Sequence, residues 1–144
     1  MADYIGFTRS NYFRVTDPDG LKKIIKAIMV DGEKMELWEL TENGTTYYGF
    51  GAYGSISGLR YADGNDDHGD EFEADAVYEA LGKVVAPDDA IIITEIGYEK
   101  LRYLTAYAVI ITRTEVEFVE LRSDALDTAQ RMLRNPEYNP RMDY

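Results

Sequence analysis

The dipeptide Asn43-Gly44 separates two strand-like stretches, residues 35–41 and 45–53. Asn-Gly favours the positive φ angles of a two-residue type I′ turn, whose twist matches that of two antiparallel strands. The pair therefore predicts a β-hairpin and makes an antiparallel sheet the starting point for the rest of the fold.

A strand and a helix are predicted before this hairpin. Residues 11–16 alternate as a short strand, and Asp17-Pro18 then provides an N-cap and a first helical residue. The predicted helix ends at Asp31-Gly32. Its apolar stripe has helical spacing and consists of Leu21, Ile24, Ile25, Ile28 and Met29.

Two helices and three strands are predicted after the hairpin. Residues 54–69 are rich in Gly, Ser, Asp and Asn and predict a loop, after which Asp70 and Glu73 form a capping-box pattern that opens a helix. Three strands follow, at residues 90–96, 101–112 and 115–121. Ser123 then predicts the cap of a third helix. The face expected to point inward consists of Ala125, Leu126, Ala129, Met132 and Leu133.

These elements give the order β-α-β-β-α-β-β-β-α. Short connections between neighbouring strands favour a mostly antiparallel sheet of about six strands with the three helices on one face, an α+β fold. The length of 144 residues suits one domain. We assign residues 1–134 to a single α+β domain and residues 135–144, with two prolines, to an irregular C-terminal tail.

Composition and the N-terminus predict a cytoplasmic protein. The chain has no cysteine, which suits a reducing compartment and excludes disulfides and thiolate metal sites. The first residues show neither a basic region nor an apolar run typical of a signal peptide. The longest apolar stretches, residues 90–93 and 106–111, are far shorter than the ~20 residues of a membrane helix.

The net charge of −12 is concentrated in one part of the chain. Residues 1–60 hold 8 acidic and 7 basic groups, residues 61–100 hold 12 and 2, and residues 101–144 hold 7 and 6. The middle segment therefore carries −10 and each flanking segment −1. Such a field repels phosphates, so direct binding to nucleic acid is not expected, whereas a basic protein would be attracted.

Most of this charge belongs to a run without Lys or Arg, formed by Asp63, Asp66, Asp67, Asp70, Glu71, Glu73 and Asp75. One interpretation is a solvated loop and helix start, favoured by the helix dipole. Another is charge mimicry of a nucleic acid. A helix from Asp70 to Glu79 would carry five carboxylates, one per ~2.7 Å, against one phosphate per ~3.4 Å of a DNA strand. Glu71, Asp75 and Glu79 would share one helical face.

A divalent-cation site in this run is a third interpretation. An EF-hand loop beginning at Asp63 would place His68 where glycine is required and Ala74 where a bidentate glutamate belongs, so that motif fails. An irregular metal site or an enzyme site would use Asp66, Asp67, His68 and Asp70. The single histidine cannot form the usual zinc sites, and no nucleophile–base pair is evident. The prediction is a non-enzymatic protein without a cofactor.

Residues 49–54, Gly-Phe-Gly-Ala-Tyr-Gly, match the dinucleotide-binding pattern G-x-G-x-x-G. That fingerprint requires a following helix to hold the pyrophosphate, and none is predicted here. We expect these glycines to relieve crowding, to form a bulge or to let the loop turn.

Tyr53 and Tyr61 flank the glycine-rich loop beside the acidic run. Among the twelve tyrosines of the chain, these two are placed to anchor a protein partner on the charged surface, although ordinary sheet packing explains tyrosines in strands equally well.

Four stretches resemble those of small uncharacterised acidic proteins carried on bacterial mobile elements: residues 12–17, 48–56, 99–103 and 135–138. Such elements often encode acidic inhibitors of host defence, including antirestriction proteins that mimic DNA and anti-CRISPR proteins, although the antirestriction family's own motifs are absent here. The resemblance implies a non-enzymatic inhibitor of a basic nucleic-acid-binding protein such as a CRISPR effector or restriction nuclease. The alternative is a protein-interaction or regulatory domain without mimicry. The residues predicted to bind the partner are Asp63, Asp66, Asp67, Asp70, Glu71, Glu73, Asp75, Glu79, Tyr53 and Tyr61.

Overall fold

The hairpin predicted at Asn43-Gly44 is present in a computed structural model of the chain, which describes residues 5–61, 71–99 and 103–141. It joins β3 (Glu36–Glu42) to β4 (Thr45–Arg60), and the pair Glu42–Thr45 closes the ladder. Asn43 and Gly44 have φ angles of 52° and 79°. Two positive values in succession are those of a type I′ turn, so this prediction is confirmed.

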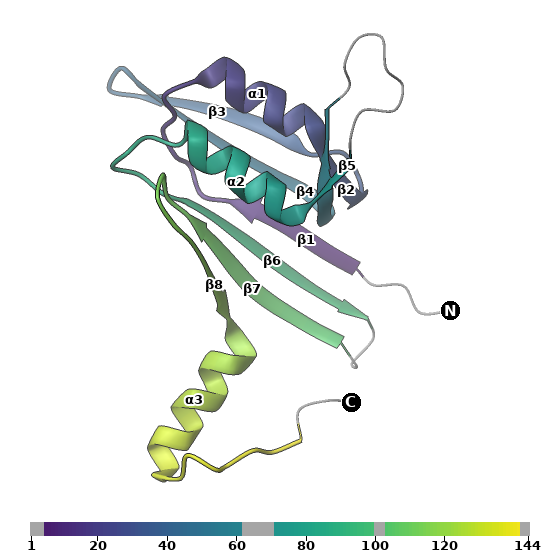
Figure 1. Cartoon of the computed structure of the whole chain (residues 1–144), viewed down its shortest axis with the longest axis vertical. Helices are drawn as coiled ribbons and strands as arrows, with labels where there is room; N and C mark the ends of the chain where they lie inside the picture. Colours follow the sequence, from purple (N-terminus) through teal and green to yellow (C-terminus); the bar gives the residue numbers. More distant parts are fainter. Residues whose placement is uncertain (1–4, 62–70, 100–102, 142–144) are drawn as a thin grey trace.

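The fold is α+β, as predicted, with an antiparallel sheet as its centre (Figure 1). Eight strands are present in the described residues, against about six predicted. The order across the sheet is β2-β4-β1-β6-β7-β8, and β3 and β5 both pair with the long strand β4. The remaining strands are β1 (Ile5–Ser10), β2 (Ile28–Gly32), β5 (Glu71–Glu73), β6 (Ile91–Glu99), β7 (Tyr103–Ile111) and β8 (Val116–Glu120).

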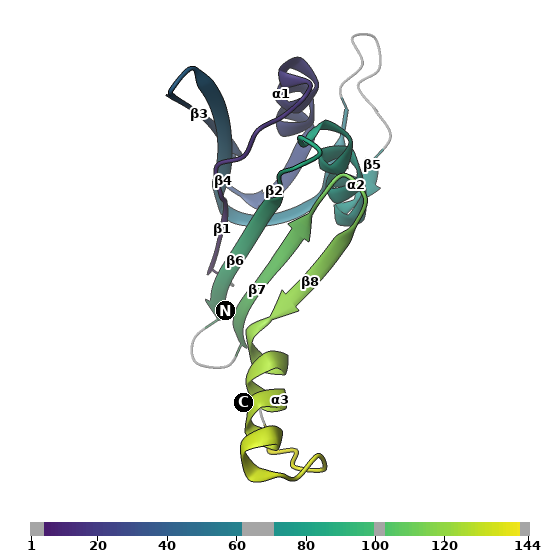
Figure 2. The ribbon, with the colours of Figure 1, turned by 90° about the vertical axis from the view of Figure 1, so that its left-hand side faces the viewer.

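Two helices, α1 (Pro18–Ala27) and α2 (Ala74–Val84), lie side by side on one face of the curved sheet (Figures 1 and 2). Asp17 caps α1 by accepting a hydrogen bond from the Gly20 amide at 2.9 Å, as its sequence position predicts. The core lies between these helices and the sheet. Its fully buried side chains are Phe13, Phe50, Leu21, Leu81, Ile91, Ile111, Val77, Val85 and Val109.

The first helix is shorter than predicted, because it ends at Ala27 and residues 28–32 form β2. Ile28 has extended backbone angles and pairs with Leu59 in the second half of β4. The apolar stripe does not distinguish a helix that continues past residue 27 from a strand that begins at residue 28, because Ile28 would be buried in both. In the structure it is buried in the strand. Pairing with a strand 30 residues away decides the boundary.

The first strand also lies earlier than predicted, at residues 5–10 in place of 11–16. The Asn11 side chain interrupts the ladder: its amide nitrogen donates to the Ala90 carbonyl at 3.0 Å and its oxygen accepts from the Ile92 amide at 2.8 Å. Beyond this point Phe13 and Val15 form isolated bridges. The Asn11 side chain therefore makes the hydrogen bonds to residues 90 and 92 that the backbone of a continued strand would otherwise make.

The predicted loop at 54–69 is wrong in its first part, since β4 continues to Arg60 and pairs there with β2 and β5. The second helix consequently begins at Ala74 rather than at Asp70, and the side chain of Glu73 makes no capping bond. Residues 71–73 satisfy their backbone groups in the sheet, so they do not need the helical turn that the capping-box pattern predicts.

The third helix, α3 (Leu121–Leu133), departs most from the prediction. It begins directly at the end of β8, two residues before Ser123, and none of its residues is buried. The face predicted to point inward is exposed at Met132 and Leu133. Figures 1 and 2 show α3 projecting away from the sheet. None of the helices within residues 5–61, 71–99 and 103–141 combines the length and apolar character needed to cross a bilayer.

Candidate functional site

A groove with acidic sides runs between α2 and the β7–β8 hairpin. Two adjoining hollows of about 240 and 410 Å³ form it, and they share Tyr78, Glu79 and Val116. We define the acidic groove by the six lining residues that form its floor and its rim, namely Asp75, Tyr78, Glu79, Glu115, Val116 and Phe118. Three of these belong to α2 and three to the hairpin, so the groove exists because the helix lies beside the edge strand of the sheet.

The floor of the groove is apolar. The rings of Tyr78 and Phe118 meet edge to face, with their centroids 5.8 Å apart. Tyr78 is 7% exposed, whereas Phe118 remains 60% exposed and Val116 39%. A large aromatic surface open to water beside a buried ring is a typical anchor point for a partner side chain.

The rim of the groove is negatively charged. Asp75 and Glu79 lie one turn apart on α2 and are exposed, as is Glu115 directly before β8. The ion pairs found among the described residues join Arg14 to Asp88 and Asp89 and Lys22 to Glu39, so none of them neutralises these three carboxylates. The rim therefore presents three charges to an incoming ligand.

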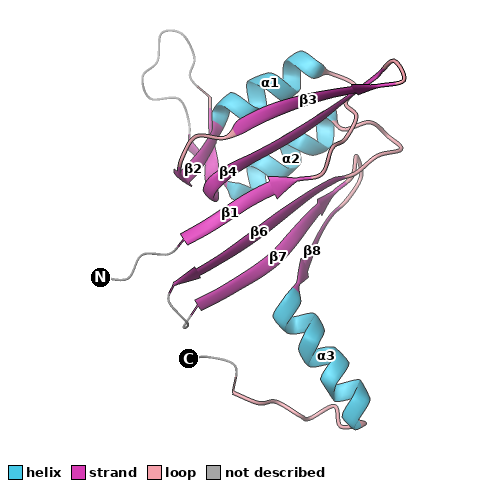
Figure 3. Cartoon of the chain, turned by 180° about the vertical axis from the view of Figure 1, so that it is seen from behind, coloured by secondary structure: helices cyan, strands magenta, loops and turns pink. Residues whose placement is uncertain are grey.

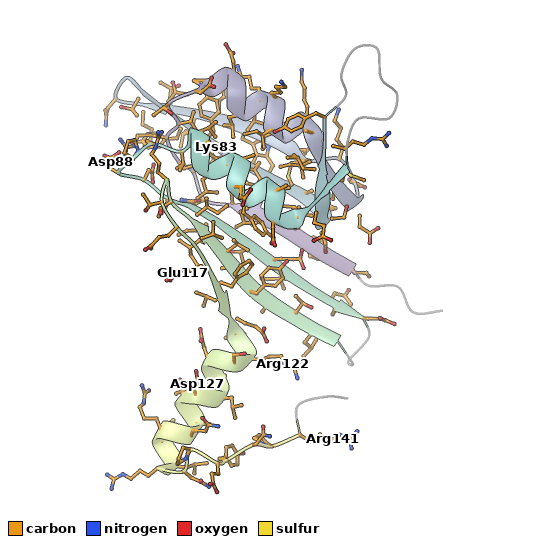
Figure 4. All side chains as sticks on the ribbon, in the orientation of Figure 1. Lys83, Asp88, Glu117, Arg122, Asp127 and Arg141 are labelled. Atoms are coloured by element: carbon orange, nitrogen blue, oxygen red, sulfur yellow. The ribbon has the colours of Figure 1, made fainter. Side chains whose placement is uncertain are left out.

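Two cations, Arg113 and Lys83, also line the larger hollow, at one end of the groove. Arg113 donates two hydrogen bonds to the Val85 carbonyl, at 3.2 and 2.9 Å, and one to the Thr16 hydroxyl at 2.9 Å. These bonds fasten the β7–β8 turn to the end of α2. Lys83 lies in the last turn of α2, where a positive charge complements the helix dipole (Figure 4).

The Tyr78 hydroxyl at the floor is held in its neutral form. Burial raises its pKa above the usual 10.0, and the negative charges of Glu95 and Asp75 raise it further. The folded chain therefore holds this proton more tightly than the unfolded chain. Its contribution to stability is complete below pH 10 and is lost as the pH rises through the folded-state pKa.

We expect Tyr78→Phe to reduce the loss of stability in alkali. The variant lacks the titrating hydroxyl, so its unfolding free energy should fall less than that of the native chain between about pH 8 and about pH 11. Urea unfolding at both pH values, followed by circular dichroism, measures the difference. Equal alkaline slopes in the two proteins would contradict the assignment.

Half of the predicted acidic residues fall within the described part of the chain. Asp63, Asp66, Asp67 and Asp70 lie outside it, as does His68. Glu71 is in β5 rather than on a helical face, so the expected row of Glu71, Asp75 and Glu79 is reduced to the last two. Glu73 is exposed at the N-terminus of α2 beside them.

The two predicted tyrosine anchors lie away from the acidic groove. Tyr53 is 61% exposed on the opposite face of the sheet, where its ring meets Phe7 edge to face with centroids 5.7 Å apart. Tyr61 is half-buried between α1 and α2, with the Lys23 ammonium 5.4 Å from its ring centre. The structure therefore separates these rings from the carboxylates that they flank in the sequence.

The glycine run at 49–54 is part of β4 and is followed by more strand, so the helix that a dinucleotide site requires is absent from this stretch. A Cβ at Gly49 would come within 3.2 Å of the Tyr12 ring, and one at Gly51 within 2.9 Å of the Trp38 ring. The expectation that these glycines relieve crowding is confirmed. The Trp38 ring in turn receives the Arg9 guanidinium, 4.4 Å from its centre.

No local pattern predicted Tyr78, Val116 and Phe118 as floor residues, because α2 and β8 are about 40 positions apart and their contact depends on the sheet order. Within the described ranges no three His, Asp or Glu side chains are grouped as a metal site would need. The proposed metal ligands at 66–70 lie outside those ranges.

Comparison of the chain with protein-family models, curated proteins and solved structures returned no match.

Proposed function

We propose that this chain is a non-enzymatic acidic inhibitor that binds a basic nucleic-acid-binding defence protein, of the anti-CRISPR or antirestriction kind, by occupying the groove meant for DNA or RNA. The observation that supports this best is the acidic groove itself. Its carboxylates are exposed and lack ion-pair partners among the described residues, and they surround an apolar floor.

Lysine and arginine side chains match both parts of this site. Their aliphatic stems can lie on the exposed Phe118 ring and on Val116, while their charged heads reach the carboxylates of Asp75 and Glu79. A phosphate backbone offers a basic groove charge and hydrogen-bond acceptors, whereas this site adds apolar contact to both. Such a surface combines electrostatic steering with a packed anchor.

The overall charge favours the same partner. A net charge of −12 raises the rate at which a cationic protein is encountered, and the effect weakens as salt screens the field. Glu73 and Asp75 end an acidic run that begins at Asp63, so the stretch of sequence leading into α2 is strongly negative.

A second candidate function is protein binding without mimicry. It is favoured by the opposite sheet face, where Phe7 and Tyr53 are 44% and 61% exposed. Arg9 and Glu36 beside them line a hollow of about 210 Å³ with Trp38. A partner bound here would depend on aromatic contacts and not on the carboxylates of α2.

The triple variant Asp75→Asn, Glu79→Gln, Glu115→Gln tests the proposal. Complex formation with candidate CRISPR effectors and restriction nucleases is measured at about 50 mM and about 300 mM salt. The native chain should bind more tightly at low salt, and we expect the variant to lose at least roughly tenfold in affinity, since close interfacial charge pairs contribute a few kcal/mol.

A matched control removes three charges elsewhere, through Asp19→Asn, Glu33→Gln and Glu42→Gln, all at exposed positions. Asp19 is in the first turn of α1, as Asp75 is in that of α2, so both variants lose one charge from a helix N-terminus. The control should bind within about twofold of the native chain. Equal losses of affinity in the two variants would show that only the net charge matters. If the native chain forms no complex at either salt concentration, the proposed function is rejected.

A further inference from the structure

One side of the helix α3 has no packing partner among the described residues, whereas on its other side Gln130 donates a hydrogen bond to the Tyr138 carbonyl at 2.8 Å. It has 13 residues, none of them buried, and Leu121 and Met132 are 63% and 77% exposed. These two residues share an exposed stripe with Ala125 and Thr128, at spacings of four, three and four. A helix of this length is marginally stable in water by itself, so a packing surface for the stripe is expected.

The chain's own sheet cannot supply that surface. β8 ends at Glu120 and α3 begins at Leu121, with no connecting residue between them. Glu120 still has extended backbone angles, φ −118° and ψ 126°, so the chain makes no reversal at the junction. The helix contacts the neighbouring strands β7 and β8 near this junction, where Arg122 lines a hollow with Leu104 and Tyr107, and then projects away from the sheet (Figure 4).

The chain also carries an unpartnered sheet face. On the side opposite α1 and α2, the apolar side chains of Ile5, Phe7, Ile96, Tyr98 and Leu104 are 44%, 44%, 56%, 44% and 48% exposed. Ile5 pairs with Tyr98 and Tyr98 with Leu104, while Phe7 pairs with Ile96, so these residues form adjoining rows across β1, β6 and β7. We call them the outer apolar face; none of the helices in the described residues lies over it (Figure 3).

The two unpartnered surfaces match in size. The stripe belongs to a helix about 20 Å long at ~1.5 Å per residue. The nine residues of β6, at the centre of the outer apolar face, extend about 30 Å. A helix packed along this strand would therefore have sheet beneath its whole length.

The C-terminal segment that contains α3 and the rest of the chain differ in charge in the sense that favours contact, although α3 itself, with two arginines and two aspartates, is neutral. Residues 121–141 hold four arginines and three acidic residues, a charge of +1. The rest of the chain holds 11 basic and 24 acidic residues, a charge of −13. Two whole chains repel one another, but the C-terminal segment of one is attracted to the body of the other.

We infer that the chain forms a symmetric dimer in which α3 of each copy lies on the outer apolar face of the other. A single twofold axis relates the two copies, so both exposed surfaces of each copy are covered by the other copy, as in other exchanged helical arms. Reciprocal exchange doubles the buried area, which brings two small helix–sheet contacts toward the size of a standard interface. The acidic groove lies on the other side of the sheet and stays open in this arrangement.

Sedimentation equilibrium of the full chain tests the dimer. We expect dimers at about 0.1 mM protein, and at least roughly tenfold weaker dimerisation in each of the variants Met132→Asp and Ile96→Asp. Both side chains are exposed in the single chain, so neither change should alter the melting of the monomer's core. Ser123→Asp, on the opposite side of α3 from the stripe, is the matched control and should dimerise as the native chain does.

The absence of cysteine allows the arrangement to be tested directly. A mixture of the Met132→Cys and Ile96→Cys variants, mildly oxidised, should form mainly the mixed disulfide. A disulfide formed only between two copies of the Met132→Cys variant would place helix on helix and overturn the arrangement. A chain that stays monomeric up to about 0.2 mM, with the outer face left to another protein or to solvent, would overturn the dimer itself.

Discussion

Gly54→Ala is expected to destabilise the chain by about 3 kcal/mol or more, because two costs coincide at this residue. Gly54 has a φ of 139°, in a region that residues with a Cβ rarely adopt. A Cβ would also collide with the Asp31 carbonyl oxygen and come within 2.9 Å of the Val30 side chain. Both atoms belong to β2, so relief of the clash would separate β2 from β4.

Gly44→Ala provides the matched control, since Gly44 also has a positive φ, 79°, but a Cβ there would meet nothing within 4 Å. Only the conformational cost remains, about 1–2 kcal/mol. Thermal and urea unfolding of both variants measure the difference. Similar losses in the two would show that crowding against β2 does not constrain Gly54.

Local chemistry explains which parts of the fold were predictable. Asn43-Gly44 and Asp17-Pro18 carry their turn and cap in adjacent residues, and both features are present. The segments at 28–32 and 71–73 were predicted as helix and are strand, because each pairs with the second half of β4. The pairing residues of β4 lie about 11 to 31 positions away, and no residue pattern within either segment predicts that pairing. Apolar spacing shows that a segment has a face to bury, but the pairing decides its conformation.

The dependence on pairing between distant segments also explains which parts of the acidic groove were predictable from the sequence. The carboxylates of Asp75 and Glu79 were predicted from an acidic run, which is visible in the sequence. The aromatic floor was not, because Tyr78 and Phe118 meet only through the sheet order. The stripe of α3 that was predicted to point inward consists of Ala125, Leu126, Ala129, Met132 and Leu133, because their spacing is that of a core helix. What covers such a stripe depends on where the preceding strand ends, and here the strand ends at Glu120 at the edge of the domain.

The proposed inhibition and the proposed dimer can fail separately. Neutralising Asp75, Glu79 and Glu115 changes no residue of α3 or of the outer apolar face, so dimerisation should persist in that variant. Met132→Asp leaves the acidic groove intact, so its intrinsic affinity for a basic groove should persist. In the dimer two acidic grooves belong to one particle, which would strengthen binding to a partner with two basic sites through effective concentration.

Phe50→Ala is expected to cost about 3–5 kcal/mol of unfolding free energy, the range for loss of a buried aromatic ring. Phe50 is fully buried at the centre of β4, and its ring meets Phe13 edge to face with centroids 5.9 Å apart. Its removal leaves a cavity between the sheet and the helices, where the neighbours are themselves fully buried and can relax only in part. Urea unfolding of the variant gives the loss directly.

Phe118→Ala distinguishes a core ring from a ring offered to a partner. Phe118 is 60% exposed, so its removal should cost below about 1 kcal/mol of stability, although Tyr78 loses its edge-to-face contact. Because the ring forms the exposed floor of the acidic groove, the same variant should weaken binding to a basic partner at least roughly tenfold. A stability loss equal to that of Phe50→Ala would make Phe118 a core residue, and the groove would then lack the apolar anchor on which the proposed inhibition depends.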